Sequence, residues 1–167
     1  MTAFLDIETD EARRPIAVGV LRDSETRQAV AKDPGWVVDP CDVVDLLRLG
    51  ERLVTFNGAS FDLPILRALS PGLARKIAAC EHVDLYPLAR AARLSGGLKE
   101  IEYRIGFRAA EAPERAGRVY ARWAAWREHG DAEALRELLD YNRDDLLGTE
   151  ALYRRLLALG AVLPRFG

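Results

Sequence analysis

The sequence has few cysteines, few histidines and no long apolar run. Cys41 and Cys80 have no CxxC spacing and no cysteine or histidine cluster near them, which argues against a disulfide scaffold or a zinc site. We expect both thiols to be reduced and buried. His82 and His129 lie in no metal-ligand pair, so each is expected to be structural or at the surface. The chain shows no transmembrane stretch and no signal segment, so we expect a cytoplasmic protein without a membrane contact.

An excess of positive charge is also missing. The 167 residues include 24 lysines and arginines against 26 aspartates and glutamates, a formal net charge of -2. Any contact with nucleic acid must therefore come from a local patch. The hydrophobic content of 49% and charged content of 30% are those of an ordinary globular protein. The length predicts a single domain, residues 1–167, with a core of its own.

What the sequence does contain is an apolar strand that ends in two carboxylates, over residues 4–10. Side chains on a strand alternate between faces, so Asp6 and Glu8 point to one face while Leu5 and Ile7 pack into the core. Two like charges on one face repel each other and lose solvation unless a positive group lies between them. A divalent metal would fill that role, whereas a solvated acidic pair at a strand end is the simpler alternative.

The rest of the chain predicts a mixed α/β fold. Polar residues 22–26 have the composition of a hairpin turn, so the first three strands are expected to be antiparallel. Asp42 is the expected cap of the first helix and Gly50 its end, and residues 109–117 read as a polar linker. After the first strand, the predicted strands cover 15–21, then either 28–30 or 35–38, and then 52–56 and 82–85. The predicted helices cover 43–47, 61–69, 73–80, 85–94, 98–105, 119–126 and a long segment from about 131. These predict a five-stranded mixed sheet flanked by helices.

Two further carboxylates stand out by their context. Asp62 follows an Asn-Gly turn at the predicted start of a helix, where the helix dipole alone would favour a carboxylate. Asp145 lies inside the last predicted helix, four residues after Tyr141, so the two share one face. A charged run in a helix is more often a solvated face, and Arg143 beside Asp144 fits that alternative.

Taken in order, the three acidic sites resemble the DEDD superfamily of 3'-5' exonucleases, which have a ribonuclease-H-like fold. The sites are Asp-x-Glu on the first strand, Asn-Gly-x-x-Phe-Asp after a later strand, and Tyr-x-x-x-Asp in the last helix. The tyrosine is typical of the DEDDy branch, which includes the proofreading domains of family B DNA polymerases. Phe-Asn-Gly-x-x-Phe-Asp-x-Pro, His-x-Asp-Leu, Gly-Leu-Lys and Asn-x-x-Asp are similar to motifs of the small stand-alone YprB-like group of predicted exonucleases, many of which have histidine in place of Tyr141.

The resemblance implies that Asp6, Glu8, Asp62 and Asp145 bind two divalent cations. Two Mg²⁺ or Mn²⁺ ions about 3.5–4 Å apart clamp the attacking and leaving oxygens of a phosphodiester, and oxygen ligands select these ions over zinc. Tyr141 completes the implied catalytic set. Since the unperturbed pKa of tyrosine is about 10, we expect its hydroxyl to orient the attacking water rather than to remove a proton.

Five residues are candidates for substrate binding, each with a plainer alternative. Lys99 and Arg143 can contact phosphates or be exposed charges, and Asn57 can lie near the site or simply adopt the positive φ of a turn. Phe61 can stack on a terminal base or belong to the core. Thr9, which follows the acidic pair directly, is the fifth candidate.

The leading hypothesis is a metal-dependent 3'-5' exonuclease that acts on single-stranded ends of DNA or RNA, with a polymerase or helicase as a possible partner in trans. The alternative is a catalytically inactive nucleic-acid-binding or adaptor domain on the same fold. A third reading, in which the acidic residues only form a solvated surface, predicts no stabilisation by divalent metal.

Overall fold

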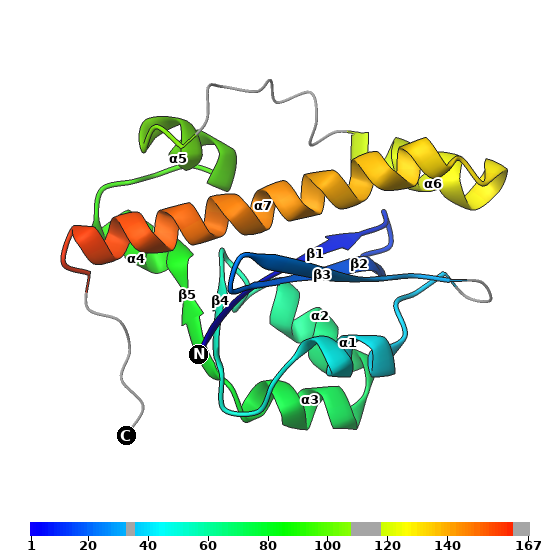
Figure 1. Cartoon of the computed structure of the whole chain (residues 1–167), viewed down its shortest axis with the longest axis horizontal. Helices are drawn as coiled ribbons and strands as arrows, with labels where there is room; N and C mark the ends of the chain where they lie inside the picture. The colour runs from blue at the N-terminus through cyan, green and yellow to red at the C-terminus, as the bar shows by residue number, and fades with distance from the viewer. Residues whose placement is uncertain (33–35, 108–117, 162–167) are drawn as a thin grey trace.

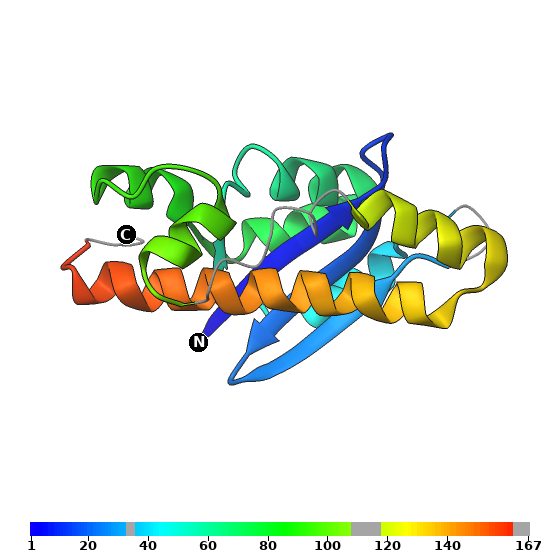
Figure 2. The same cartoon turned by 90° about the horizontal axis from the view of Figure 1, so that it is seen from above.

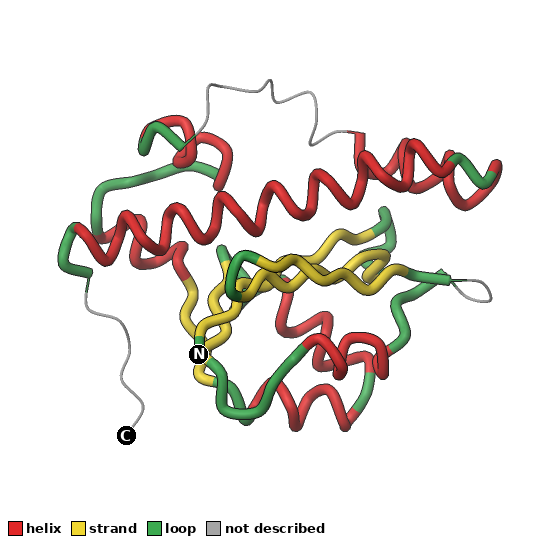
Figure 3. The backbone as a smooth tube through the Cα atoms, in the orientation of Figure 1, coloured by secondary structure: helices red, strands yellow, loops and turns green. Residues whose placement is uncertain are grey.

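One five-stranded sheet lies between two layers of helices (Figures 1 and 3). The structure is a computed structural model that describes residues 1–32, 36–107 and 118–161. The strands are β1 (Thr2–Thr9), β2 (Pro15–Arg22), β3 (Glu25–Val30), β4 (Arg52–Thr55) and β5 (Glu81–Asp84). The helices are α1 (Pro40–Leu46), α2 (Asp62–Leu69), α3 (Pro71–Ala78), α4 (Leu85–Ala91), α5 (Leu98–Arg104), α6 (Val119–His129) and α7 (Ala132–Ala158).

The strand that carries the acidic pair is the central strand of the sheet. The strand order is β3-β2-β1-β4-β5, with β1 antiparallel to β2 and parallel to β4. β2 and β3 are antiparallel, and β4 and β5 are parallel. The prediction of a mixed five-stranded sheet whose first three strands are antiparallel is confirmed. Because a central strand is paired on both sides, the side chains at its end are held in a fixed position.

The hairpin between β2 and β3 is tighter than the sequence predicted. Arg22 pairs with Glu25, so only Asp23 and Ser24 form the turn, and both have positive φ, 51° and 67°. A two-residue turn of this kind matches the twist of antiparallel strands. The third strand therefore begins at Glu25. The alternative strand over 35–38 is wrong in its described part, where Val37 makes an isolated bridge to Lys32.

The two faces of the sheet are covered by different helices. α1, α2 and α3 lie on one face, while α7 crosses the other face with α4, α5 and α6 beside it (Figures 1 and 2). Leu5 and Ile7 of β1 are buried on the α1–α3 side, as predicted, together with Leu63 and Leu73. On the opposite face, Phe4 packs edge-on against Tyr153 of α7, with ring centres 5.6 Å apart. The acidic pair alternates with Leu5 and Ile7 and so faces α7.

Several helix boundaries differ from the prediction. Asp39, and not Asp42, caps α1, because the carboxylate of Asp39 accepts a hydrogen bond from Cys41 N (2.8 Å) and Pro40 fills the first helical position. Cys41 is exposed on this first turn, so the prediction that it is buried is wrong, whereas Cys80 is buried. α3 begins at Pro71, where Ser70 caps it. The predicted linker over 109–117 lies outside the described residues.

α7 is the longest helix, with 27 residues. Asp131 caps it by accepting hydrogen bonds from Glu133 N and Ala134 N, which confirms the predicted start. Its apolar face spans the sheet, with Leu138, Leu146, Leu152 and Leu156 buried. Within the part of the chain that the structure describes, no helix has the length and apolarity to cross a membrane.

Candidate active site

The end of β1 directs two carboxylates toward α7. Asp6 pairs with Gly19 and Glu8 with Ala17 of β2, and the register shifts between Glu8 and Thr9. Asp6 is partly buried and Glu8 is buried. β4 pairs with β1 only as far as Phe4, so among the described residues no strand pairs with the later part of β1 on the β4 side. The acidic pair therefore lies at the place where the two parallel strands separate.

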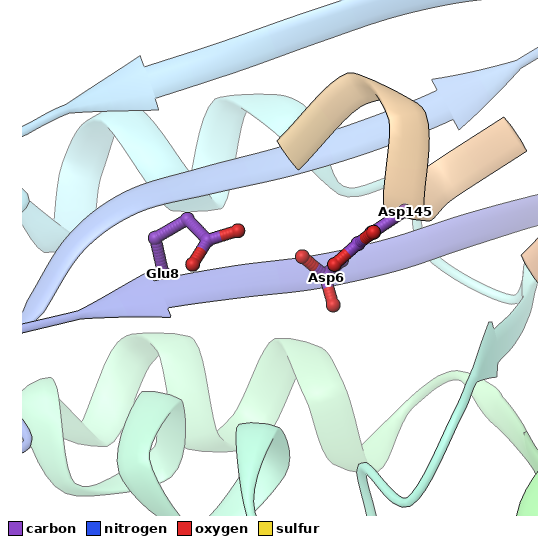
Figure 4. Close-up of side chains that lie close together, drawn as sticks. All are labelled: Asp6, Glu8 and Asp145. Atoms are coloured by element: carbon purple, nitrogen blue, oxygen red, sulfur yellow. The ribbon is translucent and has the colours of Figure 1, made fainter. Parts of the chain in front are cut away.

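α7 supplies a third carboxylate to the same place. One oxygen from each of Asp6, Glu8 and Asp145 lies within 4.8 Å of the other two. Figure 4 shows Asp6 and Asp145 close together, with Glu8 further along β1. The face of α7 that carries Asp145 is thus the face that packs on the sheet. The alternative in which Asp145 is fully solvated is therefore wrong. We call Asp6, Glu8 and Asp145 the carboxylate cluster.

Burial and mutual repulsion make ionisation of the carboxylate cluster unfavourable. Desolvation, followed by the negative charge of Asp145, raises the pKa of both Asp6 and Glu8 well above the usual range. Desolvation also raises the pKa of Asp145, although Lys99 acts in the opposite direction. A bound cation would relieve this repulsion. All donors in the carboxylate cluster are oxygens, which are the ligands that Mg²⁺ and Mn²⁺ prefer, so these residues fit such an ion.

Asp62, the fourth predicted ligand, is close to the carboxylate cluster but not part of it. It is the first residue of α2 and only 4% exposed, and its Oδ1 accepts a hydrogen bond from the backbone N–H of Ile7 (3.2 Å). Burial raises the pKa of Asp62 to about 7, and the charge of Asp62 in turn raises the pKa of Asp6 and Glu8. Asp62 therefore belongs to the same electrostatic unit. Its role as a metal ligand stays a prediction.

The loop before Asp62 is held by Asp84. The carboxylate of Asp84 accepts hydrogen bonds from the backbone N–H groups of Asn57 (2.8 Å) and Ala59 (3.0 Å), and also caps α4 through Tyr86 N (2.9 Å). Asn57 has φ 64°, so the turn conformation considered for it is present. This arrangement fixes the entry into α2 and with it the position of Asp62.

Lys99 is directed into the site. Its ammonium group forms ion pairs with Asp145 and with Glu102 (3.2 Å) and lies 5.5 Å from the centre of the Tyr141 ring. The side chain of Lys99 is 38% exposed, so the alternative of a fully solvated charge is wrong. Glu102 is buried against α7, where it closely approaches Gly148. The ammonium group of Lys99 thus already neutralises part of the negative charge of the carboxylate cluster.

Tyr141 lies beside Asp145, as its spacing predicts. A hydrogen bond from the Tyr141 side chain is among the interactions that lower the pKa of Asp145. Burial, and then the negative charges of Asp145 and Glu8, raises the pKa of Tyr141 well above its ordinary value of 10. The hydroxyl is therefore a hydrogen-bond donor at neutral pH and not a base. Chemically, it can orient a bound molecule but cannot take its proton.

The remaining predicted substrate residues occupy different environments. Thr9 is buried at the end of β1. Phe61 packs against the core on the α1–α3 side while staying partly exposed. Arg143 is exposed on α7. Contacts of these residues and of Asn57 with a substrate stay predictions.

The sequence did not reveal a pocket next to Tyr141. It is lined by Arg118, Arg122, Glu137, Asp140 and Tyr141. Arg122 pairs with Glu137 (2.8 Å), and its positive charge also lowers the pKa of Glu8. The arginines come from the start of α6, and their proximity to the site follows from the packing of α6 on α7, which local sequence patterns do not encode.

Asn142, the first residue of the Asn-x-x-Asp motif, has a contact at the site that the motif did not predict. Its amide nitrogen donates a hydrogen bond to Oδ2 of Asp6 (2.8 Å), and the side chain is completely buried. The sequence contains a signal for it, because Asn142 lies three residues before Asp145 and so on the same face of the helix. A buried amide in such a position needs a polar partner.

Comparison with known proteins agrees with this architecture. The family B DNA polymerase from the hyperthermophilic archaeon Pyrobaculum calidifontis has a similar fold, with a TM-score of 0.70 and 18% sequence identity. The similarity covers 93% of this chain and 24% of the polymerase chain, so the present chain spans about a quarter of that protein. No curated protein matches the chain.

Residues 3–157 match the family described as the RNase_H superfamily. The matched region includes all four predicted carboxylates, which lie on β1, α2 and α7. The predicted ribonuclease-H-like fold is thereby confirmed. Because this match spans nearly the whole chain, the chain belongs to the RNase_H superfamily.

Proposed function

We propose that the protein is a metal-dependent 3'-5' exonuclease that hydrolyses phosphodiester bonds at the end of single-stranded DNA or RNA. The observation that carries the proposal is the convergence of Asp6, Glu8 and Asp145 from β1 and α7. Membership in the RNase_H superfamily supports nuclease activity in general. The polarity of cleavage comes from the resemblance to DEDDy exonucleases. Delivery of the substrate by a polymerase or helicase in trans belongs to the same proposal.

In this proposal Asp6, Glu8, Asp62 and Asp145 hold two divalent cations, Mg²⁺ or Mn²⁺. When bound, such ions lower the pKa of the attacking water and neutralise charge on the leaving oxygen. The protein's own groups then have two tasks. The hydroxyl of Tyr141 orients the attacking water by hydrogen bonding, and the four carboxylates keep the charge of the site negative enough to attract cations.

Positive side chains around the carboxylate cluster are suited to the phosphates of a nucleic acid. Lys99 lies on one side, against Asp145, and Arg143 is exposed on α7. Arg118 and Arg122 line the pocket that Tyr141 shares. Guanidinium groups bind phosphate oxygens well, and contacts to the backbone carry no sequence preference. Glu137 and Asp140 line the same pocket, and Arg122 pairs with Glu137, so a phosphate bound here would have to compete with these carboxylates.

The test is degradation of labelled oligonucleotides by the purified protein. DNA and RNA strands labelled at either end are incubated with Mg²⁺ or Mn²⁺, and we expect stepwise shortening from the 3' end. Asp6→Asn and Asp145→Asn should abolish the activity, while Asp45→Asn, a change at an exposed position of α1, should leave it intact. Undiminished cleavage in both site variants would refute the proposal. Binding of the oligonucleotide without any product would favour an adaptor domain instead.

A further inference from the structure

Three residues form a row across the sheet next to the carboxylate cluster. Asp6 of β1 pairs with Gly19 of β2, and Gly19 pairs with Gln28 of β3. Residues that are direct neighbours across strands point to the same face of a sheet. The middle position of this row has no side chain. It therefore leaves a gap between Asp6 and Gln28 on the face that α7 covers.

Asn142 of α7 fills this gap. A Cβ atom at position 19 would lie 2.1 Å from Oδ1 of Asn142, which is far closer than nonbonded atoms approach. Any residue other than glycine there would displace Asn142. The glycine thus serves a close approach between β2 and α7, and it allows a buried amide to lie over the centre of the row.

Both ends of the Asn142 amide are engaged. Its nitrogen donates to Oδ2 of Asp6 (2.8 Å), with a longer contact to the backbone oxygen of Asp6 (3.4 Å). Its oxygen accepts a hydrogen bond from Nε2 of Gln28 (2.9 Å). Gln28 Nε2 also donates to the backbone oxygen of Leu139 (2.8 Å). Because a backbone carbonyl can only accept, Leu139 fixes which end of the Gln28 amide faces α7.

The direction of the whole chain of hydrogen bonds follows from that fixed end. Gln28 presents a donor, so Asn142 must turn its oxygen toward Gln28 and its nitrogen toward Asp6. The reverse orientation of Asn142 would set its oxygen against an oxygen of the ionised Asp6 carboxylate, the form that binds a cation, where no hydrogen is available. The hydrogen bond from Asn142 also opposes the repulsion that Asp6 experiences from Asp145 and Glu8.

We propose that Asn142 and Gln28 are positioning residues that hold the Asp6 carboxylate in the orientation required to bind a divalent cation. Asn142 contacts Asp6 directly, and Gln28 acts through Asn142 from two strands away. The inference rests on the proposed function, in which Asp6 is a metal ligand. Partners that orient a ligand in this way typically contribute 10- to 100-fold to metal affinity or activity.

Replacement of Gln28 by glutamate tests the inference. Gln28→Glu keeps the shape but presents an acceptor to Asn142, so the Asn142 amide would turn its oxygen toward Asp6. We expect the affinity for Mn²⁺, measured by calorimetry at about pH 8, to fall by about 10-fold or more. A nonspecific effect of the added negative charge has the opposite sign, because it would strengthen cation binding. Thr26→Glu adds the same charge two residues along the same face of β3 and is the matched control.

Additional readouts distinguish positioning from a loss of folding. In EDTA, Gln28→Glu should lower the melting temperature, because the hydrogen bond to the Leu139 carbonyl is lost, but the protein should still unfold cooperatively. Excess Mn²⁺ should restore its nuclease activity, as it cannot for an unfolded protein. If Gln28→Glu does not fold, Gln28→Met, which removes the donor without adding charge, decides the case through a smaller loss of Mn²⁺ affinity.

The outcomes separate the two proposals. If the wild-type protein binds Mn²⁺ and Asp6→Asn abolishes binding, while folded Gln28→Glu or Gln28→Met binds as the wild type does, the positioning role is refuted and the proposed function stands. If the wild-type protein binds no Mn²⁺, or Asp6→Asn binds it unchanged, the proposed function itself fails and the positioning role fails with it.

Discussion

Lys99 and Asp145 form an ion pair at the edge of the carboxylate cluster. In the absence of metal this ammonium supplies positive charge to a buried acidic site. Lys99→Met should destabilise the metal-free protein by about 1–2 kcal/mol, less than for a fully buried pair because the lysine is 38% exposed. Thermal melts in EDTA measure the loss. Added Mn²⁺ should then raise the melting temperature more in the variant than in the wild type.

The control for this prediction is Lys32→Met. Lys32 pairs with Asp42 at the surface, with 76% of its side chain exposed. Such pairs contribute about 0–1 kcal/mol, so this variant should melt nearly as the wild type does. Equal stability of the Lys99 and Lys32 variants would show that Lys99 does not compensate the carboxylate cluster.

The metal-free protein should become less stable as the pH rises through about 7. The pKa of Asp62 is raised to about 7, and those of Asp6 and Glu8 are also raised, so the folded state binds more protons than the unfolded state at neutral pH. This stabilisation is fully present below the unfolded carboxyl pKa of about 4 and is lost as the pH rises through the raised pKa values. Melts in EDTA at about pH 6 and pH 8 should differ by several degrees.

The same melts in Mg²⁺ provide the comparison. A divalent cation that binds ionised carboxylates should stabilise the protein more at pH 8 than at pH 6 and thus reduce the slope. Asp62→Asn should flatten the pH dependence near 7. A melting temperature in EDTA that rises from pH 6 to pH 8 would contradict this account of the site.

Tyr141→Phe should reduce turnover without moving the alkaline limb of the pH profile. The pKa of Tyr141 lies well above its usual value, so the group does not titrate near neutral pH and cannot act as a base there. Loss of its hydroxyl would remove the orientation of the attacking water and the hydrogen bond to Asp145, which we expect to lower kcat by about 10- to 100-fold. Initial rates between about pH 6 and pH 9 test this. Tyr120→Phe, at an exposed position on α6, is the control. A shifted alkaline limb in Tyr141→Phe would indicate proton transfer by the tyrosine after all.

Gly19→Ala should destabilise the protein. The added Cβ would lie 2.1 Å from Asn142 Oδ1 and 2.8 Å from Leu146 Cδ1, so α7 must shift away from β2. Overpacking of this kind costs about 1–3 kcal/mol, which denaturant unfolding can measure. Gly72→Ala is the matched control, since the nearest atom to its new Cβ is Ser70 Oγ at 3.9 Å and alanine favours the helix. Similar stability of both variants would contradict the close approach at Gly19.

The sequence predicted those parts of the site that depend on local periodicity. Alternation along β1 predicted that Asp6 and Glu8 share one face of that strand, and the helical spacing of Tyr141 and Asp145 predicted that they share one face of the last helix. The structure agrees with both predictions. The resemblance of the motifs then joined the two segments. The fold class followed from the order of apolar segments, because strands and helices in this sequence have distinct spacings.

Other features depend on contacts between distant segments and were missed. Asn142 approaches Asp6 only because Gly19 has no side chain, a relationship among three elements that no single segment contains. Lys99 was predicted either to contact a phosphate or to be an exposed charge; its pairing with Asp145 was not predicted, since it arises from the packing of α5 against α7. The prediction of Asp42 as the cap of α1 was wrong because Asp39 is also a suitable cap. Pro40 favours Asp39, since proline is preferred at the first position of a helix.

The bridge between Asn142 and Asp6 joins residues that are 136 positions apart in the sequence. Contacts of such separation form late, because closing a long loop costs entropy that local contacts do not recover. β1 therefore emerges from the ribosome with its carboxylates exposed to solvent and stays so until α7 docks. Under the proposed function, metal capture should then coincide with the last step of folding, and a nascent chain interrupted before α7 would carry no hydrolytic activity.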